Sequence, residues 1–389
     1  MDDDVLGAAV RALLENPRAD TGREISTTEQ AAHAVGLLDQ GLHDGPGVFR
    51  EMAEGAQRGA ETLSSDRLQV LSEFVQNADD AGAGHLRFLW RPDALLIAHD
   101  GAGLHLGDVL LLGMPWLSGK TADARSTGRF GIGLSTLRAL ATTWEVHGHP
   151  FHVRFADLSL EPVPPPRLPD EISGPGWTVF RIPLQPGTLS SAQLFEWFES
   201  WSDASLLFLR HLERLEVTAG ELSTVLALAW EEQDRQRIPF DGGEQDVRVR
   251  HATTRDGAQW RVYTAEVAPH AGWERNHKAL GAALPVAVAL PLQHGERGSV
   301  HAGLPVAGLD AAVRVHSHFD PVASREGFAD SRLNHQLVPL VADLWAAVRD
   351  VLVAVDPRAW HLTRFPRDLA RQRRTVAPGA GRLACGGGL

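Results

Sequence analysis

The chain has 389 residues, of which 43% are hydrophobic, and it carries a formal net charge of −12. Its length predicts about two or three domains with buried cores, and its acidic balance argues against general binding to nucleic acid. The one cysteine, Cys385, excludes an intrachain disulfide framework, and because no stretch reads as a signal peptide or a membrane span, we expect a cytoplasmic protein without membrane contact.

The first part of the chain mixes helical and strand-like patterns. Apolar residues recur at helical spacing within 1–60, which is expected to be a helical N-terminal extension, and again within 67–81. Shorter helices are predicted at 109–112 and 131–141, on either side of a polar loop or lid over 113–128. Strands, recognised as short apolar runs bounded by turn residues, are predicted at 86–90, 94–98, 144–147, 153–155 and 177–184.

The pattern changes near 185–190, where a second α+β domain is predicted to begin. This domain opens with an aromatic amphipathic helix over 191–201, expected to pack in the core, and closes with a long helix over 334–353. Its strands are predicted at 215–219, 225–230, 247–251, 260–265 and 286–292. The predicted fold class is thus α+β. The N-terminal extension covers 1–60, the two domains cover 61–187 and 190–355, and an Arg/Gly-rich tail covers 356–389.

The helix predicted over 67–81 carries polar residues among apolar ones. Glu73, Asn77 and Asp80 stand at i, i+4 and i+7, so they share one face. A carboxylate and a carboxamide on a half-buried helix are costly unless a polar partner meets them. Glu73 would orient or deprotonate a water that attacks a γ-phosphate, and Asn77 would ligate Mg²⁺, a hard cation that prefers oxygen. The alternative is a solvated face of a surface helix.

A glycine-rich turn, His99-Asp100-Gly101-Ala102-Gly103, directly follows the strand predicted at 94–98. A carboxylate at the end of a strand can accept a hydrogen bond from the amino group of adenine. Glycines beside it allow the backbone to approach the ring. An ordinary Asp-Gly turn is the alternative.

A second glycine-rich stretch, Gly128–Gly133, runs into the helix predicted at 131–141. Glycines at a helix N-terminus present N–H groups that can cradle phosphates. The nearby GMPWLSGKT, 113–121, resembles a P-loop but places five residues before Gly-Lys-Thr where that motif needs four, so we reject a P-loop. Lys120 would still reach a phosphate from a lid.

In order and spacing, the three pieces resemble the GHKL ATPase superfamily, which includes gyrase B, histidine kinases, mismatch-repair ATPases and the ninety-kilodalton heat-shock chaperone. EFVQNADDAGA and SGKTADARSTGRFGIGLSTL are similar to segments of the ATP-binding repeat of sacsin, and GRFGIGL to the glycine box of the chaperone. Gly176-Trp177-Thr178-Val179 resembles the strand that ends the domain. The resemblance implies a GHKL (Bergerat) ATP-binding α/β sandwich followed by a second α+β domain.

The resemblance also implies a role for each matching residue. Glu73 would be catalytic by positioning the attacking water, and Asn77 would bind Mg²⁺ beside Asp80. Thr178 would support the adenine end, and Arg325 would touch the γ-phosphate, although a surface ion pair is the alternative for this arginine. The phosphates of ATP would be wrapped by Gly128, Arg129, Phe130, Gly131, Ile132 and Gly133.

One position departs from the family pattern, Asp-x-Gly-x-Gly, whose first Asp reads adenine. His99 stands at that position, and Asp100 follows one place later, ahead of Gly101 and Gly103. Either Asp100 takes the role through a local shift, or adenine is read through His99 and water.

Together these features predict a slow, Mg²⁺-dependent ATPase of the sacsin or heat-shock-chaperone type, in which closure of the lid on ATP rearranges the second domain. Its partners would be a protein client and, in a homodimer, a second copy of the chain. The alternative is a nucleotide-gated regulatory or scaffold module with little or no hydrolysis. A phosphotransfer kinase is disfavoured because 1–60 offers no evident paired helical hairpin with an acceptor histidine, and a topoisomerase or mismatch-repair role would require further DNA-handling domains.

Overall fold

The computed structural model describes residues 3–17, 19–44, 68–113, 137, 140–156, 159–185, 187–269, 283–293, 297–322 and 327–355. The chain divides into two compact units, Met1–Ala229 and Trp230–Leu389. Each unit combines helices with a mixed sheet, so the fold class is α+β, as predicted. The domain boundary predicted at 187–190 falls inside the first unit. Whether the chain on each side of that boundary folds as an independent domain stays a prediction.

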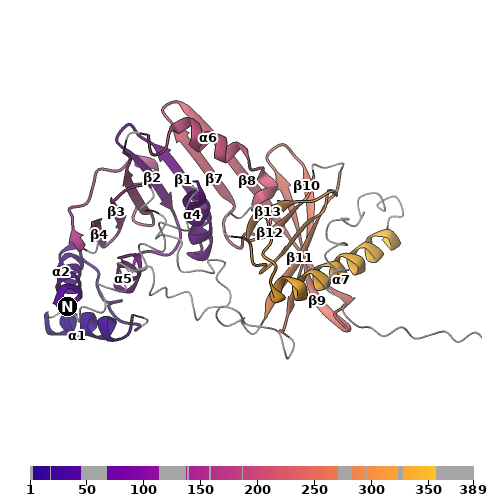
Figure 1. Cartoon of the computed structure of the whole chain (residues 1–389), viewed down its shortest axis with the longest axis horizontal. Coiled ribbons are helices and arrows are strands. Elements are labelled where there is room, and N and C mark those ends of the chain that lie inside the picture. Colours follow the sequence, from indigo (N-terminus) through magenta and orange to yellow (C-terminus); the bar gives the residue numbers. More distant parts are fainter. Residues whose placement is uncertain are drawn as a thin grey trace, which may run out of the picture. The chain divides into compact units, whose positions relative to one another are not determined.

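The first unit contains most of the helices in the described residues, coloured indigo to magenta in Figure 1. Its helices are α1 (Asp3–Glu15), α2 (Thr28–Asp44), α4 (Gln69–Asp80), α5 (Leu106–Gly113) and α6 (Ser191–Glu199), with 3₁₀ turns at Asp170–Ile172 and Asp203–Leu206. Its strands are β1 (His85–Trp90), β2 (Ala94–His99), β3 (Thr143–Gly148), β4 (Phe151–Ala156), β5 (Ser159–Pro162), β6 (Thr178–Pro183) and β7 (Arg214–Ala219).

The strands of this unit follow the order β7-β1-β2-β6-β3-β4-β5, and β7 also pairs with the start of β8 (Leu222–Phe240). Strands β1 and β7 run parallel, and the other neighbouring strands of this part of the sheet, as far as the structure describes them, pair antiparallel. The β2–β6 register pairs His99 with Thr178 and Ile97 with Phe180. Because side chains alternate between faces, these four residues share one face of the sheet.

Aromatic contacts identify the face that α4 and α6 cover. Phe74 of α4 meets Phe180 edge to face, with ring centroids 5.0 Å apart. Trp197 of α6 meets Phe88 of β1 in the same manner at 5.5 Å. The aromatic helix predicted over 191–201 is therefore a core helix, as expected, and His99 lies on the sheet face that faces α4.

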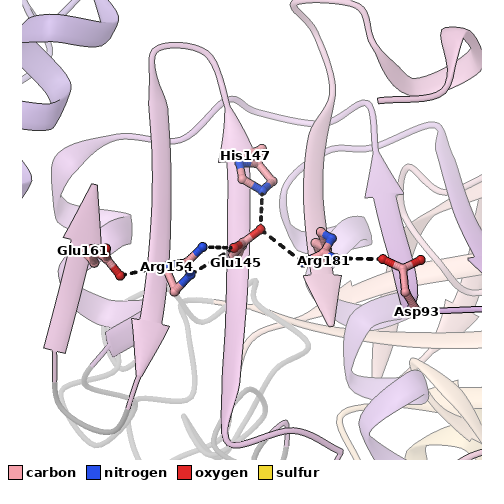
Figure 2. A network of polar contacts seen from close by, with 6 residues as sticks. All are labelled: Asp93, Glu145, His147, Arg154, Glu161 and Arg181. Carbon is pink, nitrogen blue, oxygen red and sulfur yellow. Dashed lines mark hydrogen bonds and ion pairs between the residues drawn. The ribbon is translucent and has the colours of Figure 1, made fainter. Parts of the chain in front are cut away.

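The opposite face carries a small apolar cluster and a polar network. Leu89, Leu96, Ala98 and Val179 pack there with Ile172. Further along the same face, Glu145 of β3 accepts hydrogen bonds from Nε and Nη2 of Arg154 at 3.0 and 2.9 Å (Figure 2). Its other oxygen lies 3.3 Å from His147 Nε2 and 3.6 Å from Arg181 Nη1. Burial alone would raise the pKa of Glu145, but Arg154, His147 and Arg181 together lower it below its usual value.

Replacing Glu145 with glutamine is expected to lower the free energy of unfolding by about 2 kcal/mol, because two arginines lose their shared carboxylate. The pKa of Glu145 is lowered by folding, so its contribution is present above the pKa of an unfolded glutamate and is lost as the pH falls through the folded value. Denaturant unfolding of the wild type and the variant at pH 7 and in acid measures both effects. Glu161, whose side chain is 59% exposed, provides the control: Glu161→Gln should cost less than about 0.5 kcal/mol, and equal losses for the two variants would contradict the account.

The second unit is built on strands that cover one side of a long helix, α7 (Arg332–Val355). Its strands after β8 are β9 (Gly243–Thr254), β10 (Gln259–Val267), β11 (Leu284–Pro291), β12 (Ser299–Ala302), β13 (Leu304–Gly308) and β14 (Arg314–Ser317). They follow the order β13-β12-β14-β11-β10-β9, with β12 and β14 parallel. Val286, Val288 and Tyr263 are buried in one core with Leu337, Val341 and Leu344 of α7.

Most of the elements predicted from the sequence are present within the described residues. The helices expected within 1–60 and over 67–81, 191–201 and 334–353 correspond to α1, α2, α4, α6 and α7. The sequence did not indicate β5 or β12–β14, and β8 extends well beyond the predicted 225–230. In the part of the chain that the structure describes, no helix is long and apolar enough to cross a membrane.

Candidate nucleotide site

Helix α4 places the predicted catalytic and metal-binding residues on the first unit. Its apolar residues Leu71, Phe74, Val75 and Ala78 are buried, and the carboxylate residue Glu73 is buried with them at 8% exposure. Asn77, one turn later, is partly exposed. The carboxylate of Glu73 and the more accessible carboxamide of Asn77 thus lie one turn apart on the same helix.

The helix stops sharply at its C-terminal end because Gly82 adopts a left-handed conformation, with φ of 74°. The N–H of Gly82 donates to the carbonyl of Asp79, and the N–H of Ala83 donates to the carbonyl of Ala78, each at 3.0 Å. This is the Schellman arrangement that ends many helices. It leaves Asn77 and Asp80 in the last turn, close to the loop that follows.

Asp79 is an anchor that the sequence analysis missed. Its side chain is fully buried, and one oxygen, Oδ1, accepts hydrogen bonds from the backbone N–H groups of Arg210, His211 and Leu212 at 2.8, 2.8 and 3.0 Å. A carboxylate in the last turn of a helix is disfavoured by the helix dipole, so these donors offset an unfavourable position. They fix the C-terminal end of α4 to the segment before β7.

Asp80, which the sequence predicts to face the nucleotide, forms an ion pair with Arg210. Its carboxylate lies 3.5 Å from Arg210 Nη2, and its side chain is 8% exposed. Asp80 therefore helps to hold α4 against the same segment that Asp79 binds. Its predicted contact with the nucleotide stays a prediction.

The turn after β2 packs against the end of α4. The N–H of Ala102 donates to the carbonyl of Ala81 at 2.7 Å, and a Cβ at Gly101 would lie 2.7 Å from that same oxygen. Only glycine allows this approach, so the requirement for Gly101 is one of packing between helix and turn. A Cβ at Gly103 would meet nothing within 4 Å. The turn that follows His99 is thus held against the C-terminal end of α4.

Asp100 is already engaged with the first strand. Its Oδ1 accepts a hydrogen bond from the backbone N–H of His85 at 2.8 Å, and its Oδ2 lies 3.0 Å from His85 Nδ1. Of the two possibilities for reading the base, this geometry favours His99 over a shifted Asp100.

His99 is a buried, neutral imidazole at the end of β2. Burial lowers its pKa to about 4, with nearby Asp100 opposing the shift only in part. Its Nδ1 accepts a hydrogen bond from the N–H of Gly101 at 3.3 Å. Because a backbone N–H can only donate, the proton of the neutral ring is assigned to Nε2.

Thr178 stands directly opposite His99 on β6 and is 1% exposed. Its Oγ1 is buried without a hydrogen-bond partner in the described part of the chain. Gly148 lies beside it, since a Cβ there would approach Thr178 Oγ1 and Leu104 Cδ1 to 3.1 Å each. A hydroxyl in this condition costs stability unless a polar group meets it, so the site suits the polar edge of a ligand.

The remaining predicted site residues lie outside the described residues. They are Lys120, Gly128, Arg129, Phe130, Gly131, Ile132, Gly133 and Arg325, and their phosphate-binding or catalytic roles stay predictions. Among the residues that are described, no group of three or more His, Cys, Asp or Glu side chains could hold a metal ion. The carboxamide oxygen of Asn77 suits a Mg²⁺ ion that takes its other ligands from phosphate and water.

Comparison with known proteins finds similarity to this chain among solved structures. No protein-family model and no curated protein matches it. Among solved structures, the chain is similar to the topoisomerase IV ATP-binding domain of Francisella tularensis, solved in complex with a small-molecule inhibitor. The two chains are 11% identical, and the alignment covers 79% of this chain and 91% of that chain with a TM-score of 0.38. At this level of similarity, the roles of the residues rest on their own geometry.

Proposed function

We propose that the first unit binds a Mg²⁺–nucleoside triphosphate and hydrolyses it slowly, with ATP as the nucleotide that the GHKL resemblance predicts. The observation that carries the proposal is the buried Glu73 one turn before Asn77, on a helix whose end contacts the turn after His99. The same sheet face holds the buried hydroxyl of Thr178, which has no hydrogen-bond partner among the described residues. A polar ligand with an aromatic ring suits these groups together.

In this proposal each residue acts on one part of the ligand. Glu73 orients the attacking water and takes its proton as a positioned general base. His99 and Thr178 hold the base. Asn77 would hold Mg²⁺, which would neutralise charge on the phosphates when bound. Asp79 holds the helix that carries Glu73 and Asn77, so it acts through them.

The resemblance extends the proposal to a chaperone-like cycle. Nucleotide binding would be coupled to rearrangement of the second unit, and hydrolysis would reset it, because the γ-phosphate favours one state only before cleavage. A protein client and a homodimer belong to this part of the proposal. The predicted lid, 113–128, lies almost entirely outside the described residues.

A thermal-shift titration of the full chain with Mg²⁺–ATP tests the binding step. A ligand that binds only the folded state raises the melting temperature, and the rise grows with the logarithm of the ratio of ligand concentration to Kd. We expect the wild type to show a Mg²⁺-dependent rise, and Asn77→Ala to lose most of the Mg²⁺-dependent part. The control is Ser72→Ala, at a partly buried residue of the same helix, and this variant should behave as the wild type does. A Mg²⁺-dependent rise in Asn77→Ala as large as that of the wild type would exclude Asn77 as the ligand.

A further inference from the structure

We propose that His99 makes this site selective for a 6-oxopurine nucleotide, such as an inosine or guanosine triphosphate, over an adenine nucleotide. The inference rests on the proposed function, since it assigns the base to a site that must first bind a nucleotide. It concerns the pair His99 and Thr178, which face each other across the β2–β6 ladder.

The first step is the direction of the hydrogen bond that His99 can offer. Nδ1 is engaged by the N–H of Gly101, so the ring nitrogen left for a ligand is Nε2, which carries the proton. The ring stays neutral at physiological pH because burial lowers its pKa to about 4. His99 therefore presents a fixed donor, where a carboxylate would present only acceptors.

The second step concerns the carboxylate of Asp100, the residue that follows His99. Asp100 is held by His85 through both oxygens, at 2.8 and 3.0 Å. Gly101 fixes the turn against Ala81, where a Cβ would collide with the carbonyl oxygen. A shift that brought Asp100 to the position of His99 would break the contacts of the turn with both α4 and β1. The inference therefore assigns the base to His99 and Thr178, which pair across β2 and β6.

The third step is the match with the base. A 6-oxopurine presents an acceptor at position 6 and an N–H donor at N1, whereas adenine presents an amino donor at position 6 and an acceptor at N1. His99 Nε2–H can donate to the 6-oxo group, and the unpartnered Thr178 Oγ1 can accept from N1–H. With adenine in the same place, the amino group would face the N–H of His99 donor to donor, which leaves a buried polar group unpaired.

The test measures the affinities of Mg²⁺–ATP and Mg²⁺–ITP, whose bases differ only at position 6 and N1. Both are measured for the full wild-type chain and for two variants, His99→Asp and His99→Asn, whose new side chains have the same shape. We expect the wild type to bind ITP about tenfold more tightly than ATP, the effect of one unpaired buried group. His99→Asp replaces the donor with an acceptor and should reverse the preference. His99→Asn retains both an acceptor for Gly101 and a donor for the base, so it should keep the order of the wild type.

Three results would separate this inference from the proposed function. Tighter binding of ATP than of ITP by the wild type, or the same ATP-to-ITP ratio in the aspartate and asparagine variants, overturns the role of His99 and leaves nucleotide binding intact. Failure of the wild type to bind either nucleotide overturns the proposed function and the inference with it. Circular dichroism and melting without nucleotide show whether the variants fold; if neither does, the order of the two affinities in the wild type decides.

Discussion

Glu73→Gln is expected to lower the rate of nucleotide hydrolysis by at least about a hundredfold, the usual contribution of a positioned general base. Glutamine keeps the shape of the side chain and some ability to orient water, but it cannot take a proton. Because Glu73 is 8% exposed, a replacement of the same size preserves the packing of α4, and circular dichroism of the variant checks its fold. Single-turnover assays with Mg²⁺ and either purine nucleotide measure the effect.

Nucleotide affinity in Glu73→Gln should stay within about threefold of the wild type, since the carboxylate is proposed to act on the water and not on the ligand. If wild type and variant bind equally and neither hydrolyses the nucleotide, the chain is a nucleotide-gated module and Glu73 has no catalytic role. If the variant hydrolyses at the wild-type rate, another group positions the water.

Asp79→Ala is expected to destabilise the first unit by about 3–5 kcal/mol, a loss typical of removing one partner from a buried charged contact. Three backbone N–H groups, those of Arg210, His211 and Leu212, would lose their acceptor together. The end of α4 would lose its attachment to the segment before β7. Chemical denaturation monitored by circular dichroism measures the loss.

Two further variants test the mechanism behind the loss at Asp79. Asp79→Asn keeps an acceptor oxygen for the three donors, so it should cost about half as much or less. Arg210→Ala removes the partner of Asp80 but leaves the backbone N–H group in place, and it should cost about 1 kcal/mol or less. If Asp79→Asn were as damaging as Asp79→Ala, the negative charge of Asp79 would matter more than its hydrogen bonds.

The elements that the sequence predicted well are those with a strong local period. The apolar spacing of helix α4, and the two apolar runs and turn of the β1–β2 hairpin, can each be recognised within about a dozen residues of sequence. Strand β8 does not, because its run 231–237, EEQDRQR, is polar and charged throughout and has no apolar–polar alternation. Strands β12–β14 are short, and their identity depends on pairing with each other.

The parts of the site that the sequence could not predict depend on distant partners. Asp79 lies on the apolar stripe of α4, eight positions after Leu71 and four after Val75, and a carboxylate on that stripe signals buried donors. The donors themselves are more than a hundred residues away in the chain. Similarly, the position of Asp100 beside Gly101 suggested a base contact, and only the pairing of β1 with β2 reveals that His85 occupies its carboxylate.

The central claim is that α4 and the facing ends of β2 and β6 form a nucleotide site, and isothermal titration calorimetry of the full wild-type chain tests it most directly. The titrants are Mg²⁺–ATP and Mg²⁺–ITP, each repeated after chelation of Mg²⁺. The account predicts saturable binding at one site per chain, weaker after chelation and tighter for ITP. Absence of saturable binding for both nucleotides would contradict it.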